Sequence, residues 1–342
     1  MCKRTGNVLK TGTCQIGSRG MCMGNSGGQT PDTQTPTPDR GHTEYQQGIG
    51  EDTKVAARRG PTFRRRELGK ELRKLREKSN FTLQDVAKTT GFSHTKLNRV
   101  ETGDNDLPRV GDLEDLLVLY GVDSREDRET MLRLHRESLS KEPWTPYRAF
   151  MPSKMPTYRG LEQDAVSMRA FQPSFVFGLL QTEAYAKALF LIAKPVDETT
   201  TEFVEQNVRL RMERKELITR TENPLELRVV LDETAVRRMI GGPAVMREQH
   251  DALVELGQLD NVTIQILTHA VVGYRAESNF AVLDFGEVLD PIVQTDLPNT
   301  ISVTDEDREV KKHLRRFDAM RESALAPAET AGFLQRLARE WN

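Results

Sequence analysis

The chain has few cysteines, and all three of them, Cys2, Cys14 and Cys22, lie near its start. No disulfide can form within the chain after residue 22, which is typical of proteins from a reducing compartment. A zinc site needs about four ligands at close spacing, and three scattered cysteines without paired histidines do not provide them. The sequence therefore predicts no metal site.

Long apolar runs are also missing. Stretches such as "LFLIA" and "FVFGLL" have the length of core segments. A membrane helix needs roughly 18 consecutive apolar residues or more. The first residues, "MCKRTGNVLKTGTCQIG", contain no apolar segment of the kind that a secretory signal requires. We therefore expect a cytoplasmic protein that makes no contact with a membrane.

The common catalytic motifs are absent too. We find no P-loop, no H-E-x-x-H zinc motif and no G-x-S-x-G nucleophile elbow. Asp232 and Glu233 follow a predicted strand at an edge where ligands often bind, but capping of the next helix is their favoured role. His269 has no evident nucleophile beside it. We therefore expect no catalytic residues, no cofactor and no enzyme activity.

The net charge is only −2, but the charges are unevenly distributed. Residues 64–100 contain eleven Lys and Arg against four Asp and Glu, whereas residues 101–142 contain six against twelve. A nearly neutral chain can therefore carry one basic surface that attracts a polyanion. Solvated helix faces produce a similar pattern, so the charge supports a nucleic-acid partner without deciding for it.

Composition divides the chain into four parts. Residues 1–60, rich in Gly, Thr, Pro, Gln and Ser, bury too little apolar surface to fold and are predicted to be a disordered tail. Residues 61–122 have the apolar spacing of a helical domain. A charged helix and a connector rich in proline and aromatic residues occupy 123–156, and a second domain follows at 157–342.

Apolar spacing and capping residues predict the first helices. Leu68, Leu72 and Leu75 form one stripe in "RRRELGKELRKLREKSN" beneath a basic surface. Thr82 and Asp85 have the spacing of a capping box, which starts a second helix.

The next stretch, "GFSHTKLNRVETG", has the spacing of a tight turn followed by a short helix. Ala87 supplies a small residue where two helices touch, and Gly91 supplies a turn position without Cβ strain. Leu97 and Val100 supply the apolar contacts that lock the second helix onto the first. These are the requirements of a helix-turn-helix, so we expect the helix at 93–102 to enter the major groove of double-stranded DNA.

The outer face of that helix has suitable chemistry for DNA. Arg can bond guanine bidentately, Asn can bond adenine, and the Thr methyl group can contact thymine. Lys and His near the helix start, and main-chain donors at helix N-termini, suit phosphates. A solvated helix face would have a similar composition, but the turn spacing and the basic stretch favour DNA. The predicted DNA-binding residues are Thr82, Ser93, His94, Thr95, Lys96, Asn98 and Arg99.

Two stretches, "LGKELRKLREKSNFTLQDVAKTTGFSHTKLNRVETG" and "LPRVGDLEDLLVLYGV", resemble the Xre-type regulators, the Cro and lambda-repressor-like helix-turn-helix domains. The resemblance implies an all-α domain of five helices that acts as a homodimer on a near-palindromic site. It also implies an ion pair between Arg76 and Glu101, which in relatives joins the first and third helices. Leu83 departs from the family, because many relatives have Gln there in contact with DNA.

The second domain is predicted from apolar runs. "LRVVL" (227–231) and "VTIQIL" (262–267) flank a helix, which implies parallel strands. "NFAVLDF" and "PIVQTDL" predict a hairpin. "LEQDAVSMRAFQPSFVFGLLQTEAYAKALF" predicts two helices around Pro173, and two helices from about Thr304 and Pro327 close the chain. The fold class is therefore multi-domain, with an all-α domain followed by an α+β or α/β domain with a small mixed sheet.

Residues 157–338 resemble the C-terminal domain of actinobacterial antitoxin-like transcriptional regulators. The resemblance rests on four stretches: "LEQDAVSMRAFQPSFVFGLLQTEAYAKAL", "LDETAVRRMIGGPAVMREQHDALVEL", "NVTIQIL" and "ALAPAETAGFLQRLA". Members are often encoded beside a small protein, which this domain is expected to bind. The resemblance implies a DNA-binding regulator whose C-terminal domain serves dimerisation and the sensing of a partner or effector.

One alternative class stays open. In a partner-sequestering interaction module, DNA binding would be secondary and the apolar "PSFVFGLLQTEAYAKALFLIA" would form an exposed surface. As part of a core the same stretch would be ordinary, and we expect most of it to be core.

Overall fold

The computed structural model describes residues 59–271, 278–297 and 300–340. The predicted disordered tail lies outside these residues except for its last two positions, as do the three cysteines. No helix within the described ranges is long and apolar enough to cross a membrane.

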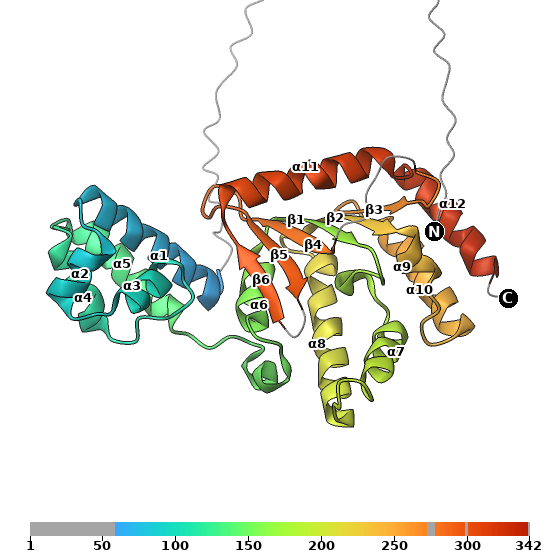
Figure 1. Ribbon diagram of the computed structural model, residues 1–342, viewed down its shortest axis with the longest axis horizontal. Coiled ribbons are helices and arrows are strands. Elements are labelled where there is room, and N and C mark those ends of the chain that lie inside the picture. Colours follow the sequence, from blue (N-terminus) through green and yellow to red (C-terminus); the bar gives the residue numbers. More distant parts are fainter. Residues whose placement is uncertain (1–58, 272–277, 298–299, 341–342) are drawn as a thin grey trace, which may run out of the picture. The chain divides into compact units, whose positions relative to one another are not determined.

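Five helices with a shared apolar core form the N-terminal part of the described chain (Figure 1). The core contains Leu68 and Leu72 from the predicted stripe, and it extends beyond residue 122 to Met131 and Leu134. The helix that sequence analysis placed in the connecting segment is therefore packed with the other four. The five helices are α1 (Pro61–Lys78), α2 (Leu83–Thr90), α3 (His94–Glu101), α4 (Val110–Leu119) and α5 (Arg125–Ser138).

A six-stranded mixed sheet forms the centre of the second domain, with strand order β3-β2-β1-β4-β5-β6. The first three strands in this order are parallel to one another, and the other three are added antiparallel. The strands are β1 (Ser167–Gln172), β2 (Glu226–Asp232), β3 (Val262–Leu267), β4 (Phe280–Asp284), β5 (Ile292–Leu297) and β6 (Thr300–Thr304).

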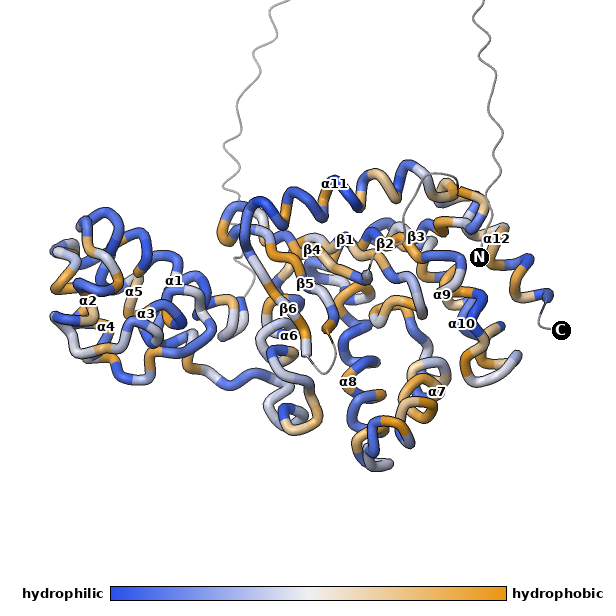
Figure 2. The backbone as a smooth tube through the Cα atoms, viewed as in Figure 1, coloured by the Kyte–Doolittle hydropathy of each residue, from blue (hydrophilic) through white to orange (hydrophobic). Residues whose placement is uncertain are grey.

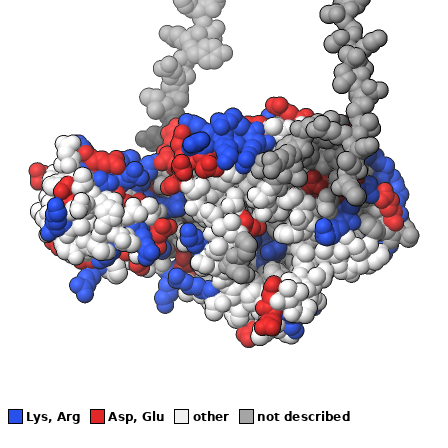
Figure 3. Space-filling view, in the orientation of Figure 1, with Lys and Arg blue, Asp and Glu red and all other residues white. Residues whose placement is uncertain are grey.

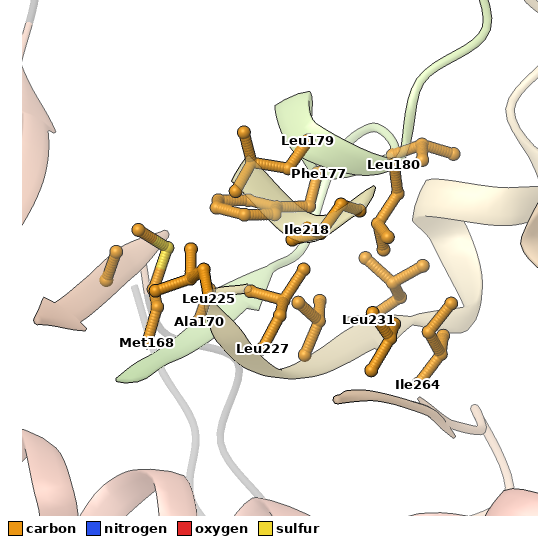
Figure 4. Packing of buried hydrophobic residues seen from close by; sticks show 14 of the residues in the cluster. Met168, Ala170, Phe177, Leu179, Leu180, Ile218, Leu225, Leu227, Leu231 and Ile264 are labelled. Atoms are coloured by element: carbon orange, nitrogen blue, oxygen red, sulfur yellow. The ribbon is translucent and has the colours of Figure 1, made fainter. Parts of the chain in front are cut away.

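Helices cover both faces of this sheet. On one face α11 packs through Phe317 and Met320 against strand residues that include Phe171 and Phe280. On the other face, side chains of β1, β2 and β3 point toward the 3-10 helix η2 and the end of α8 (Figure 4). The elements besides the strands are η1 (Thr145–Phe150), α6 (Met155–Asp164), η2 (Gly178–Leu180), α7 (Glu183–Ala193), α8 (Thr201–Thr219), α9 (Glu233–Arg237), α10 (Pro243–Leu256), α11 (Asp307–Ser323) and α12 (Pro327–Glu340).

The fold-class prediction of an all-α domain followed by an α+β domain with a mixed sheet is confirmed. The parallel pair β2–β3 and the hairpin β4–β5 are the predicted ones. The prediction of two helices around Pro173 is wrong for the residues before the proline, because 167–172 form the strand β1 between β2 and β4. The helix predicted after the proline is present as α7, which begins at Glu183. The strand β6, just before the predicted helix at 304, was not predicted.

A buried ion-pair cluster joins α6 to α8. The Glu162 carboxylate is fully buried and accepts hydrogen bonds from Arg159 and, at 2.7 and 3.0 Å, from Nη2 and Nε of Arg214. Burial alone would raise the pKa of the Glu162 carboxyl, but Arg214 and Arg159 outweigh it and hold that pKa below its usual value. The carboxylate is therefore ionised, and it compensates two buried guanidinium groups.

Replacing Glu162 by Gln should lower the free energy of unfolding by about 3–5 kcal/mol, because two buried cations would lose the carboxylate that they share. Urea unfolding followed by circular dichroism measures this change. Glu216→Gln, at an exposed position of α8, is the matched control and should leave the stability unchanged. Equal stabilities for the two variants would contradict a structural role of this cluster.

Candidate nucleic-acid interface

Local sequence determines how α2, the turn and α3 are formed. Thr82 and Asp85 make the predicted capping box, in which each side chain bonds the other residue's main-chain N–H. Gly91 ends α2 in the left-handed conformation with φ of 73°, where a Cβ would be strained. Ser93 then caps α3, because its hydroxyl accepts from the Lys96 main-chain N–H at 3.1 Å.

Contacts with α1 hold α3 in place. Leu97 and Val100 are buried in the helical core, as predicted. Gly69 of α1 permits a close approach that sequence analysis did not predict, since a Cβ there would overlap the main-chain carbonyl oxygens of Val100 and Glu101. The backbones of α1 and α3 are therefore in direct contact.

The ion pair expected between the first and third helices is confirmed. Arg76 donates from Nε and Nη2 to the two carboxylate oxygens of Glu101, at 2.6 and 2.9 Å, and from Nη1 to the carbonyl of Phe81 at 2.9 Å. The hydrogen bond to Glu101 raises the pKa of Arg76 above its ordinary value. This bidentate geometry ties the C-terminal end of α3 to α1 and to the loop before α2.

Replacing Glu101 by Gln should lower the free energy of unfolding by about 1–3 kcal/mol, because the mostly buried guanidinium of Arg76 loses its charged acceptor. Thermal and urea unfolding of the full chain measure the change. Glu114→Gln, at an exposed position of α4, should cause no comparable loss. An equal change in the free energy of unfolding for the two substitutions would show that the Arg76–Glu101 ion pair does not stabilise the fold.

The outer face of α3 is open to solvent. Asn98 and Arg99 are exposed, and Lys96 is the one predicted DNA-binding residue that is half-buried. The exposed predicted residues are Thr82, Ser93, His94, Thr95, Asn98 and Arg99. The structure therefore brings all seven predicted residues onto α3 or the N-terminus of α2, with six of them accessible.

Arg99 and Lys96 differ in how the protein itself uses them. The guanidinium of Arg99 has no hydrogen-bond or ion-pair partner among the described residues. The Lys96 ammonium lies 3.3 Å from a carboxylate oxygen of Asp112 and 4.0 Å from the ring centre of Phe92. Lys96 must therefore give up Asp112 before it can contact a phosphate, whereas Arg99 is free for a ligand.

The local excess of positive charge is largely paired within the protein. Most of the basic residues of α1 lie within 4 Å of a carboxylate oxygen, and the acceptors include Glu67 for Arg64 and Asp290 for Lys70. On the face drawn in Figure 3, blue and red side chains of the helical domain are interspersed. The attraction to DNA therefore depends less on α1 than the sequence count suggested.

Sequence analysis missed part of this surface. Gln84 and Lys88 are exposed on α2 near the capping box, and Leu83 between Thr82 and Gln84 is half-buried against the helical core. Leu83, which stands where many Xre-type relatives have Gln, therefore packs against the helical core. Gln84 is the next residue along α2, and its polar side chain is exposed. The signal that could have identified Gln84 is its position on the polar side of α2, opposite Val86.

The acidic residues after β2 have structural partners. Asp232 caps α9 by accepting from the Thr234 main-chain N–H at 2.8 Å, as predicted, and Glu233 accepts from the His269 main-chain N–H. The expectation that His269 has no nucleophile beside it is wrong, because the Thr234 hydroxyl lies 3.0 Å from its Nε2. Within the described ranges, no group of three or more His, Cys, Asp or Glu residues is placed to hold a metal ion.

Comparison with known proteins gives two family matches. Residues 67–131 match the model described as a helix-turn-helix domain, and residues 155–336 match the model described as a domain of unknown function (DUF5753). No curated protein and no solved structure matches the chain. The helix-turn-helix match covers α2, the turn and α3, and it points to a DNA-binding regulator.

Proposed function

The chain belongs to the family described as a domain of unknown function (DUF5753), and because a helix-turn-helix domain precedes that part, we propose that it is a sequence-specific DNA-binding transcriptional regulator. In this proposal α3 enters the major groove, as in Xre-type regulators, and the C-terminal domain serves dimerisation and the sensing of a partner or effector. The antitoxin-like role belongs to the same proposal.

The observation that carries the proposal is the two-sided construction of α3. Leu97, Val100 and the Arg76–Glu101 pair fix its inner side. Its outer side presents Asn98 and Arg99, and the Arg99 guanidinium has no partner among the described side chains. A rigid helix with accessible hydrogen-bonding side chains is what base recognition in the major groove requires. The capped N-termini of α2 and α3 add main-chain donors that suit phosphate oxygens.

Exposed apolar residues support protein contacts as well. Val110 and Val118 of α4 are 49% and 65% exposed, which supports a homodimer contact on the helical domain. Figure 2 shows α7 as an apolar helix, and Leu191 and Ile192 on it are 46% and 57% exposed. This second surface is the observation in favour of the alternative function, a module that sequesters a small protein encoded nearby.

Replacing Arg99 by Ala should weaken binding to operator DNA by about 1–3 kcal/mol and relax the preference at one base pair, because a bidentate base contact is lost. Gel-shift titration with promoter DNA from the protein's own locus measures the affinity. Arg125→Ala, which removes a 92% exposed arginine side chain from α5, is the matched control and should change little.

Unchanged affinity for Arg99→Ala would contradict its role as a base-reading residue. If the unaltered protein shifted no DNA from its own locus but co-purified with the small protein encoded beside it, the partner-sequestering function would replace the regulator.

Replacing Lys96 by Ala should weaken binding to all DNA sequences alike and reduce the salt dependence by about one ion, because one phosphate contact is lost. Asp112→Asn should have the opposite effect on affinity, since it releases Lys96 from its internal carboxylate partner. Binding titrations at several salt concentrations measure both changes. A change of sequence preference without a change of salt slope would mean that Lys96 contacts a base instead.

A further inference from the structure

A cavity of about 360 Å³ lies beside α8 in the C-terminal domain. This volume is within the range of small-molecule sites, which is roughly 300–1,000 Å³. One part of the wall is apolar and aromatic, formed by Phe175, Leu189, Phe190 and Phe203 together with Met151 and, at the start of α6, Met155. Phe175 and Phe190 are thus only half-buried and face an open space, whereas Phe177 and Tyr185 of the same stretch are buried.

The other part of the wall is cationic. Arg159, Arg211 and Arg214 all line the cavity, and only Glu162 among the described carboxylates lies within ion-pair distance of any of them. Glu162 is already shared by Arg159 and Arg214. The charges of three guanidinium groups are therefore balanced by one carboxylate within ion-pair distance among the described residues.

Of these three arginines, Arg211 is the one with no carboxylate partner in the described part of the chain. Its Nη1 donates to the neutral Oε1 of Gln181 at 2.8 Å, and its guanidinium carbon lies 5.1 Å from the ring centre of Phe190. Burial, followed by the repulsion of Arg214, lowers the pKa of Arg211 to about 9, so the group is still cationic at neutral pH. Gln181 is fully buried and also donates to the Val176 carbonyl, which fixes the direction of the guanidinium.

Two other acidic residues near the cavity, Asp197 and Asp296, do not form an ion pair with the Arg211 guanidinium in the described structure. Asp197 lines the cavity but is exposed, and in the described part of the chain its carboxylate makes no hydrogen bond or ion pair with Arg211. Asp296 attracts Arg211 only through space, and its two oxygens accept from Gln294 and Asn279. In addition, the buried Nε of Arg159 has no acceptor among the residues that the structure describes.

We propose that this cavity binds a small organic anion, a carboxylate or similar oxyanion on an apolar body, with the anionic group on Arg211 and the body against Phe190 and Phe203. A planar guanidinium held in direction by Gln181 matches a carboxylate bidentately. Partial burial strengthens such a pair relative to one in water. Apolar walls supply the rest of the affinity and select against small inorganic ions.

A role of this cavity in regulating DNA binding depends on the proposed function of the protein. A ligand here would be the effector that the C-terminal domain senses. Binding to the cavity itself, however, requires no DNA and can be measured separately.

The test uses the full chain and the fluorescent aromatic sulfonate 1-anilinonaphthalene-8-sulfonate as probe. We expect saturable binding at one site and displacement by octanoate at concentrations at least tenfold lower than by octan-1-ol, which has the same chain length without the charge. Equal displacement by the two compounds, or binding of the probe without saturation, would overturn the proposal.

Three variants separate the charge from the cavity. Arg211→Gln should weaken octanoate binding at least tenfold while leaving octan-1-ol unaffected, and Arg209→Gln, an exposed arginine on the same helix, should match the unaltered protein. Ala193→Phe should block the cavity for both compounds without removing charge. Circular dichroism confirms that each variant is folded.

Octanoate binding that is equal in Arg211→Gln and Arg209→Gln, or that survives Ala193→Phe, would refute the site. Gel shifts with and without octanoate then test the effector role alone. If the protein bound no DNA, the measured binding of octanoate would still support the cavity as an anion site. If it bound no octanoate, the gel shift would still support DNA binding.

Discussion

The bidentate contact between Arg76 and Glu101 is the interaction on which the candidate interface depends. It joins α1 to α3 through two residues that are 25 positions apart in the chain, and the same arginine donates to the carbonyl of Phe81 just before α2. Removing it would leave a charged group with little access to water, which is costly. The orientation of α3, and with it the direction of Arg99, therefore depends on this ion pair together with the packing of Leu97 and Val100.

Two arginines at the proposed binding surfaces differ from the paired basic residues nearest to them. The basic residues of α1 are largely paired, as are Arg159 and Arg214 in the second domain. Arg99 on α3 and Arg211 in the α8 cavity have no carboxylate within ion-pair distance among the described residues. An unpaired guanidinium is rarely favourable for folding alone, so both positions are natural places for an external anion.

Local signals predicted the helical domain well, and long-range pairing explains what they missed. The capping box at Thr82, the turn at Gly91 and the buried Leu97 follow from neighbours in sequence. The strand β1 could not be predicted in this way, because "SMRAFQ" has no β-branched residue and its partners β2 and β4 lie more than 50 residues away. The cavity around Arg211 was missed for the same reason, since its walls come from segments far apart in the chain.

Gly69 has a consequence for which positions of α3 can vary in sequence. Because α1 and α3 meet backbone to backbone at this glycine, no side chain separates the two helices at this point. Thr95, Asn98 and Arg99 are exposed and take no part in this contact, so substitutions there leave it unchanged. The outer surface of α3 can therefore change its chemistry while the packing of the helix stays the same.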